Sequence, residues 1–189
     1  QIRSRILFNE NELTAGDFLM IVKNNYFWLK PTSEAGFIAN GDIIEVLSVN
    51  EIISKYDFKF ANVTIKMIDF LEEKELDVIV MLDTIKLETP SLPYEEYQKL
   101  YQKISLEYKG ENAKKKIKEN KFLNALQVKF SYSITCHKSQ GGQWSSIFVE
   151  QPYLPNGIDK DFIRWLYTAL TMAKEKLYLI GFKDEFFSN

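Results

Sequence analysis

The sequence predicts an α/β plus β fold, in which a mostly β module of about 110 residues precedes an α/β piece of about 60 residues. Runs of high β propensity, joined by short polar turns, fill the first part of the 189-residue chain. Helical spacing of apolar residues begins only after residue 90. The end of the chain then reads as strand, turn with a helix start, strand, helix and strand, which is the order of a parallel α/β unit.

Four β-rich runs make up the first module. They span residues 16–29, 37–49, 58–70 and 76–87. Asn40-Gly41 lies between apolar flanks and predicts a hairpin turn, because both residues tolerate positive φ. Short polar connections between such runs favour a small antiparallel barrel or meander over βαβ units.

A helical segment is expected next, with Ser91 as its N-cap. Apolar residues then recur at helical spacing: Tyr97, Leu100, Tyr101, Ile104 and Tyr108. Residues 109–121 hold six Lys and two Glu. This charge run is either a solvated face or a patch that faces nucleic-acid phosphate.

The α/β piece has a simple predicted order. We expect a strand at 125–135, a turn and helix start at 135–142, a buried strand at 145–151, a helix to about Lys174 and a strand at 176–182. Asp159 is placed to cap the helix. The apolar stripe of that helix comprises Phe162, Ile163, Leu166, Tyr167 and Leu170.

The composition excludes several classes of protein. The formal net charge of −2 gives no whole-chain electrostatic argument for nucleic acid. One Cys excludes an internal disulfide framework and favours a reducing, cytoplasmic location. Because no apolar run approaches the ~20 residues of a membrane span, no membrane association is expected. The first residue is not Met, which fits either a fragment or a processed chain.

Residues 135–144, TCHKSQGGQW, hold the single Cys and the single His. Structural zinc needs about four ligands, so no metal site is expected here. Neighbouring residues on a strand point to opposite faces, which argues against a Cys136–His137 nucleophilic pair. Cys136 is better explained as a small buried hydrophobe.

The same stretch has features of a phosphate-binding loop. A polar turn followed by Gly-Gly at a helix start presents backbone N–H groups and short hydroxyls, which suit an anion. The chain contains no GxxxxGK[ST] sequence, and therefore no Walker A motif. The chemistry alone leaves two interpretations open, anion contact and a plain turn.

Three blocks resemble RecD/Dda-type superfamily 1 DNA helicases, the family of the exodeoxyribonuclease V alpha subunit. YSITCHKSQGGQW resembles a motif of the second motor domain, and LYTALTMAKEKLYLIGF resembles the last motif. GDFLMIVKNNY with FIANGDIIEVL resembles the segment that leads into an inserted barrel. The resemblance implies the C-terminal part of a RecA-like P-loop motor domain, with an inserted SH3-like β-barrel and a helical insertion.

The resemblance also implies domain limits. Residues 1–13 would be a remnant of the second RecA-like motor domain. Residues 14–124 would form the barrel, with the helical insertion at about 90–121. Residues 125–189 would complete the motor domain.

Site roles follow from the same resemblance. The loop that couples a single-stranded DNA track to the nucleotide cleft would comprise Thr135, His137, Lys138, Ser139 and Gln140. A hydroxyl of Thr135 or Ser139 would donate to a DNA phosphate. Gly141, Gly142 and Gln143 would lie at the nucleotide, although the family commonly has Glu at the position of Gln143.

Met172 occupies the position where the family has an Arg that reaches the γ-phosphate of ATP. Such an Arg contributes ~10³ or more to the rate, and Met cannot replace its charge. At ~100° per residue, position 172 lies about 180° from Ile163 and would face a cleft rather than the core. The alternative is that the helix ends before 172.

The implied function is the C-terminal region of an ATP-dependent DNA helicase, coupling ATP binding and hydrolysis to single-stranded DNA translocation. Its cofactors would be ATP and Mg²⁺, and its partners single-stranded DNA, an N-terminal motor domain of the same chain, and other recombination or repair subunits. Without Walker A, this region alone is not expected to hydrolyse ATP. Two alternatives remain: a DNA-binding or scaffolding relic with an inactive motor, and a β-barrel protein-interaction module.

Aromatic residues offer a further possibility of nucleic-acid contact. Tyr26, Phe27, Trp28 and Trp144 are of the type that stacks on bases. Aromatic residues in barrels belong more often to the core, and that is the favoured interpretation for these four.

Overall fold

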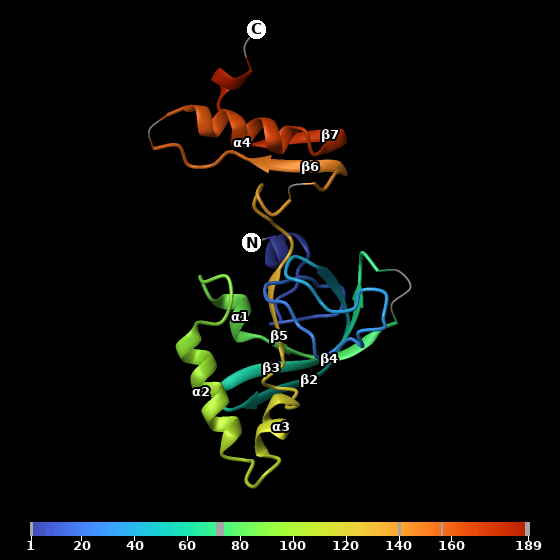
Figure 1. Cartoon of the computed structure of the whole chain (residues 1–189). Coiled ribbons are helices and arrows are strands. Elements are labelled where there is room, and N and C mark those ends of the chain that lie inside the picture. Colours follow the sequence, from blue (N-terminus) through green and yellow to red (C-terminus); the bar gives the residue numbers. More distant parts are fainter. Residues whose placement is uncertain (1, 71–73, 140, 156, 188–189) are drawn as a thin grey trace. The chain divides into compact units, whose positions relative to one another are not determined.

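The computed structural model describes residues 2–70, 74–139, 141–155 and 157–187. The chain divides into two compact units, Gln1–Ser133 and Ile134–Asn189 (Figure 1). No helix among the described residues has the length and apolar character needed to cross a membrane.

The first unit is built around a closed five-stranded barrel. Its strands are β1 (Phe18–Ile21), β2 (Ile43–Lys55), β3 (Phe58–Met67), β4 (Leu76–Met81) and β5 (Leu126–Phe130). Four of the neighbouring pairs are antiparallel, and β4 pairs with β5 in parallel. The sequence prediction of a small barrel is therefore confirmed, but the barrel is not wholly antiparallel because β4 and β5 run in parallel.

Alternation along the strands fills the barrel interior. On β3, the inward-facing Val63, Ile65 and Met67 are buried, while the residues between them are half-buried. Leu19 and Ile44, on the neighbouring β1 and β2, join the same apolar cluster. This period of two is what a strand with one face on a core requires.

Several predicted strand limits were wrong. β1 ends at Ile21, whereas the sequence suggested a strand to residue 29. Asn40-Gly41 forms a turn, with Gly41 at φ +107°, but not a strand-joining hairpin, because Ile38 pairs with Asn25 rather than with β2.

The predicted strand at 76–87 breaks after Met81 and continues as α1 (Asp83–Lys86). The buried hydroxyl of Thr84 lies 2.7 Å from the carbonyl oxygen of Met81 and accepts a hydrogen bond from the Val128 N–H at 3.0 Å. The Thr84 side chain therefore holds α1 against β5.

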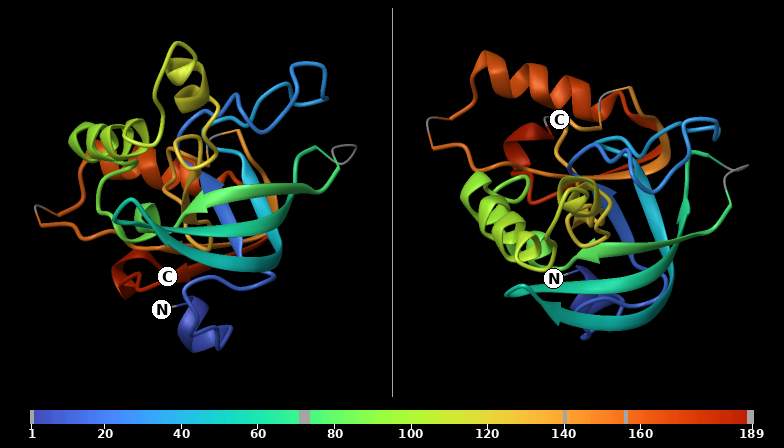
Figure 2. Two further views of the ribbon diagram at one scale, coloured as in Figure 1. Left: turned by 90° about the horizontal axis from the view of Figure 1, so that it is seen from below. Right: turned by 60° about the horizontal axis from the view of Figure 1, so that its bottom comes forward.

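Two helices in the connection between β4 and β5 cover one end of the barrel strands (Figure 2). They are α2 (Tyr94–Ser105) and α3 (Ala113–Lys118). A second apolar cluster joins Leu100 and Ile104 of α2 to Ile117 of α3 and to Phe60 and Met81 of the barrel. Helices are thus present between residues 90 and 121, where the sequence predicted them.

The start of α2 differs from the sequence prediction. Pro93 occupies the N-cap position, and no side chain caps the helix there. The predicted capping role of Ser91 was therefore wrong. Pro93 is compatible with this position because the first N–H groups of a helix have no intrahelical partner.

The first unit begins with a short π-helix, η1 (Ile2–Ile6), and ends after β5. The expected limit at 124/125 precedes β5, whereas the compact units divide after Ser133. β5 belongs to the barrel because it pairs with β1 and β4.

The second unit contains a two-stranded parallel sheet and one longer helix. β6 (Trp144–Glu150) pairs with β7 (Ala173–Ile180), and α4 (Lys160–Leu170) connects them. A short 3-10 helix, η2 (Asp184–Phe186), follows. The predicted parallel strand–helix–strand order is confirmed for these elements.

Two details of the second unit were predicted wrongly. α4 ends at Leu170 rather than near Lys174. β7 begins at Ala173, whereas the strand was expected to begin at residue 176. β6 was expected to be buried, but most of its side chains are exposed. A sheet of only two strands has no central strand, so the residues of β6 are less covered than those of a strand inside a larger sheet.

Candidate functional site

The loop that precedes β6 is a compact turn rather than a helix start. The carbonyl oxygen of Thr135 accepts hydrogen bonds from the N–H groups of Lys138, at 2.9 Å, and Ser139, at 3.1 Å. The Gly142 N–H then donates to the Ser139 carbonyl oxygen at 3.0 Å. Among the described residues of 135–143, no helix follows this turn, so the expected helix start was wrong.

Ser139 supports the turn from inside. Its buried hydroxyl lies 2.9 Å from the carbonyl oxygen of Cys136 and 3.2 Å from that of Thr135. The proton of Ser139 is therefore directed to the backbone and not to an external phosphate. The predicted contact of this hydroxyl with DNA conflicts with this arrangement.

Other predicted contact residues of the loop face solvent. Thr135, His137 and Lys138 are exposed, and so is Gln143. Gln140 lies outside the described residues. The turn therefore presents a hydroxyl, an imidazole and an ammonium group within four consecutive positions, a set that can hydrogen-bond and attract a phosphate group.

Different constraints favour glycine at the two positions of the loop, a backbone conformation at Gly141 and a steric contact at Gly142. Gly141 has φ +87°, a conformation that side-chain-bearing residues adopt with strain. At Gly142, a Cβ atom would lie only 2.2 Å from Cη2 of the Trp144 indole. The ring of Trp144 thus packs against the backbone of the loop, and any side chain at 142 must displace it.

The loop and the start of β7 meet at one end of the sheet. The Trp144 N–H donates to the carbonyl oxygen of Met172 at 3.0 Å, and Trp144 pairs with Ala173. This pairing brings the two sequence motifs, residues 132–144 and 166–182, together at neighbouring strand starts. Gln143 and Met172 immediately precede these two strands.

The side chain of Met172 is only 7% exposed, so the expectation that it points away from the core was wrong. α4 ends before this position, and Thr171 is its C-cap residue. The projection at ~100° per residue therefore does not extend to 172. The exposed helix face instead carries Ile163, which is 52% exposed.

The predicted cap of α4 is confirmed. The carboxylate of Asp159 accepts a hydrogen bond from the N–H of Phe162 at 2.7 Å. Phe162 and Ala169 are buried on the inner face of the helix. The cap thus starts the helix with its inner face towards the two-stranded sheet.

Cys136 is half-buried, and its Sγ lies 3.8 Å from the carbonyl oxygen of Trp165. Burial raises the pKa of the Cys136 thiol, which keeps the group protonated and weakly nucleophilic. In the part of the chain that the structure describes, no three His, Cys, Asp or Glu side chains are grouped to hold a metal ion.

The four aromatic residues selected from the sequence fall into different environments. Trp28 is partly buried against both apolar clusters of the first unit. Tyr26, Phe27 and Trp144 are exposed to varying degrees, although a core location was favoured for all four. Tyr26 and Phe27 line a pocket on the first unit. The other side of this pocket comes from residues such as Lys118 and Asn124, which are distant in the sequence.

Comparison with known proteins identifies a likeness in one part of the chain. The family of UvrD-like helicase C-terminal domains matches residues 130–180. This segment includes the candidate loop, both strands of the second unit and α4. It thus contains the two motifs that meet at Trp144 and Met172.

Two individual proteins are similar to the chain. An uncharacterized protein of Methanocaldococcus jannaschii is 35% identical over 60 residues, covering 31% of this chain and 5% of that protein. The crystal structure of the Pif1 helicase from Candida albicans aligns with 97% of this chain and 36% of that one, at 15% identity and a TM-score of 0.44. The chain thus spans only a small part of either protein.

Proposed function

We propose that this chain is a C-terminal region of an ATP-dependent DNA helicase of superfamily 1, of the RecD/Dda type. In this proposal the second unit completes a RecA-like motor domain, and the first unit is its inserted, SH3-like barrel. A motor domain that precedes this region supplies Walker A. The complete protein acts in the cytoplasm, in DNA repair or recombination, with ATP and Mg²⁺.

One observation carries this proposal. Residues 130–180 match the UvrD-like helicase C-terminal domain, and within this segment β6 and β7 bring the two helicase-like motifs together. In this proposal a DNA phosphate is bound by the exposed residues Thr135, His137 and Lys138. Gln143, which is also exposed, contacts the nucleotide. A loop joined directly to the strand starts is suited to transmit nucleotide-driven movement to DNA.

Each exposed loop residue has a separate part in this proposal. Lys138 supplies the positive charge, Thr135 donates its hydroxyl proton, and His137 adds a hydrogen-bonding ring nitrogen. Gly141 and Gly142 let the backbone pass close to the nucleotide. Gln140 belongs to the same motif by resemblance, and Ser139 holds the turn through its bonds to Thr135 and Cys136.

The test is ATP hydrolysis by the complete protein, with and without single-stranded DNA. We expect hydrolysis that DNA stimulates, because the loop links the two ligands. The separate 189-residue chain should show no turnover. A complete protein that lacks Walker A in its preceding domain would contradict the proposal.

A second candidate is a DNA-binding or scaffolding relic whose motor is inactive. Met172 favours it, because this side chain is uncharged and buried where the family has a catalytic Arg. The relic should bind single-stranded DNA without appreciable ATP turnover. Hydrolysis rates of the complete protein therefore separate the two candidates.

A further inference from the structure

A pocket of about 390 Å³ lies on the first unit. The chain that follows β1 forms one side, and the segment from α3 to β5 forms the other. The groups that matter for binding are Lys23, Tyr26, Phe27, Lys118 and Asn124. The size falls within the range of ligand pockets in proteins.

Hydrogen bonds fix the two sides of this pocket to each other. The carbonyl oxygen of Asn124 accepts from the Asn25 side-chain amide and from the Trp28 indole N–H, both at 2.8 Å. The Asn124 side-chain amide donates to the carbonyl oxygen of Lys118 at 2.7 Å. Asn124 therefore holds the end of α3 against the chain after β1, and the pocket is formed before any ligand arrives.

Tyr26 presents a flat aromatic surface at the pocket. Its ring stacks on Phe37 with a centroid distance of 4.8 Å and an interplanar angle of 23°. The residue is nevertheless 70% exposed. Phe37 thus supports one face of the Tyr26 ring, and the other face is free to stack on a planar group at little entropic cost.

Two lysines line this pocket, one from each of its two sides. Lys23 Nζ lies 4.8 Å from the ring centroid of Tyr97, and Lys118 ends α3. Within the described residues, neither Lys23 nor Lys118 forms an ion pair with a carboxylate. The pocket therefore retains positive charge although the whole chain carries −2.

We infer that this pocket binds one nucleotide of a single strand of nucleic acid. The base stacks on the free face of Tyr26, and the adjoining phosphates are attracted by Lys23 and Lys118. An aromatic surface flanked by cations is the arrangement that binds single strands without sequence preference. The choice of a DNA strand over a free nucleotide rests on the proposed helicase function.

The segment between β4 and β5 contributes to this pocket. Lys118 and Asn124 both come from the connection between β4 and β5, so the barrel strands alone do not form this pocket. Within the lysine-rich run at 109–121, Lys118 then supplies a phosphate contact.

The test is the affinity of the 189-residue chain for a short fluorescent oligothymidine, measured by anisotropy at several salt concentrations. Tyr26→Ala should weaken binding about tenfold and leave the salt dependence unchanged, because it removes stacking. Lys118→Ala should also weaken binding and reduce the slope of log K against log salt by about 0.7. Tyr26→Phe should retain the affinity of the original chain.

Matched controls are available on the same chain. Tyr153→Ala removes an exposed tyrosine that does not line the pocket, and Lys74→Ala removes an exposed lysine elsewhere on the first unit. Neither variant should change the affinity. Oligouridine and thymidine monophosphate, as competitors, distinguish RNA and free nucleotide from a DNA strand.

The outcomes are distinct from those for the proposed function. If Tyr26→Ala and Lys118→Ala bind as well as the original chain, or if the chain binds no oligonucleotide at low salt, the pocket inference is overturned. Competition by the monophosphate as strong as that by the oligonucleotide overturns the assignment to a strand. If only Lys138→Ala loses binding, the pocket inference is overturned as well. That result would support the helicase proposal, because Lys138 belongs to the candidate loop.

Discussion

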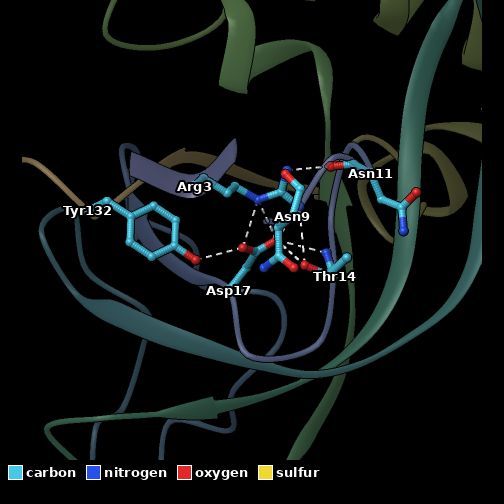
Figure 3. A network of polar contacts seen from close by, with 6 residues as sticks. All are labelled: Arg3, Asn9, Asn11, Thr14, Asp17 and Tyr132. Atoms are coloured by element: carbon cyan, nitrogen blue, oxygen red, sulfur yellow. Dashed lines mark hydrogen bonds and ion pairs between the residues drawn. The ribbon is translucent and has the colours of Figure 1, made fainter. Parts of the chain in front are cut away.

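The phenolic hydroxyl of Tyr132 donates a hydrogen bond of 2.6 Å to the buried carboxylate of Asp17, which lies 115 positions earlier in the chain. The guanidinium of Arg3 contacts the same carboxylate through Nε at 2.8 Å (Figure 3). Its Cζ lies over the ring of Phe130, 4.8 Å from the ring centroid. The N–H of Thr14 adds a bond of 2.8 Å. One carboxylate therefore joins both ends of the first unit to the start of the barrel.

The first prediction concerns the charge of Asp17. Asp17→Asn keeps the size of the side chain but leaves the mostly buried Arg3 guanidinium without its counter-charge. We expect the free energy of unfolding to fall by about 3 kcal/mol, measured by urea denaturation.

Asp57→Asn is the matched control, because Asp57 is exposed and pairs with Lys103 at the surface. Its cost should be below about 1 kcal/mol. Equal effects of the two substitutions would show that burial of Asp17 does not determine its contribution.

The second prediction concerns the loss of folding stability at acidic pH. Burial raises the pKa of Asp17, but the hydrogen bonds from Arg3, Tyr132 and Thr14 outweigh it and lower the pKa below its ordinary value. The folded state therefore prefers the ionised carboxylate, and this stability is present above the unfolded value of about 3.9. We expect it to disappear as the pH falls below about 4. Acid titration of unfolding should show a smaller loss in Asp17→Asn.

The third prediction concerns the loss of folding stability at alkaline pH. Burial, the hydrogen bond to Asp17 and the negative charge of that carboxylate raise the pKa of Tyr132 from 10.0 to about 12. The folded state therefore prefers the neutral phenol. This stability is present below pH 10, where the unfolded phenol is also neutral, and should be lost between about pH 10 and 12.

Tyr132→Phe tests this assignment, since it removes the titrating hydroxyl. The variant should be less stable at neutral pH by about 1.5 kcal/mol and should lack the alkaline step that Tyr132 contributes. Tyr153→Phe, at an exposed position, should retain the step. Persistence of the full step in Tyr132→Phe would assign it to another group.

The fourth prediction concerns Gly142 and Trp144. Gly142→Ala places a methyl group where the indole ring lies and should displace Trp144, with a change in tryptophan fluorescence and a loss of stability of about 1–3 kcal/mol. In a Trp144→Ala background the same substitution should cost less, because the obstructing ring is absent. Additive effects in this double-mutant cycle would argue against the contact.

The fifth prediction concerns Met172, which distinguishes an active motor from a relic. Met172→Arg in the complete protein restores the residue of the family motif. A motor that lacks only this charge should hydrolyse ATP at least tenfold faster. Met172→Gln is the uncharged control, and an equal gain in that variant would show that the positive charge is not responsible.

Local patterns predicted much of the fold. Alternation such as that of Val63, Ile65 and Met67 revealed the barrel strands, because each inward residue packs on one core. The cap at Asp159 was readable because its carboxylate bonds within one helical turn. Features that depend on a few neighbouring residues were thus accessible from the sequence.

Features formed by distant residues were not predicted. The contact of Tyr132 with Asp17 and that of Asn25 with Asn124 join positions roughly a hundred residues apart, and no periodicity relates them. The burial of Met172 was missed because a helix projection fails once the helix has ended. The candidate loop itself was found from its motif, whereas the inward turn of Ser139 required the structure.

The most direct test of the helicase proposal is the DNA-stimulated ATP hydrolysis of the complete protein with Lys138→Ala. Lys138 is exposed on the loop joined to β6, so its loss should weaken DNA stimulation about tenfold or more while the rate without DNA is unchanged. Tyr153→Ala, an exposed change in the same unit, should leave both rates unaltered. Full DNA stimulation in Lys138→Ala would contradict the coupling role of this loop.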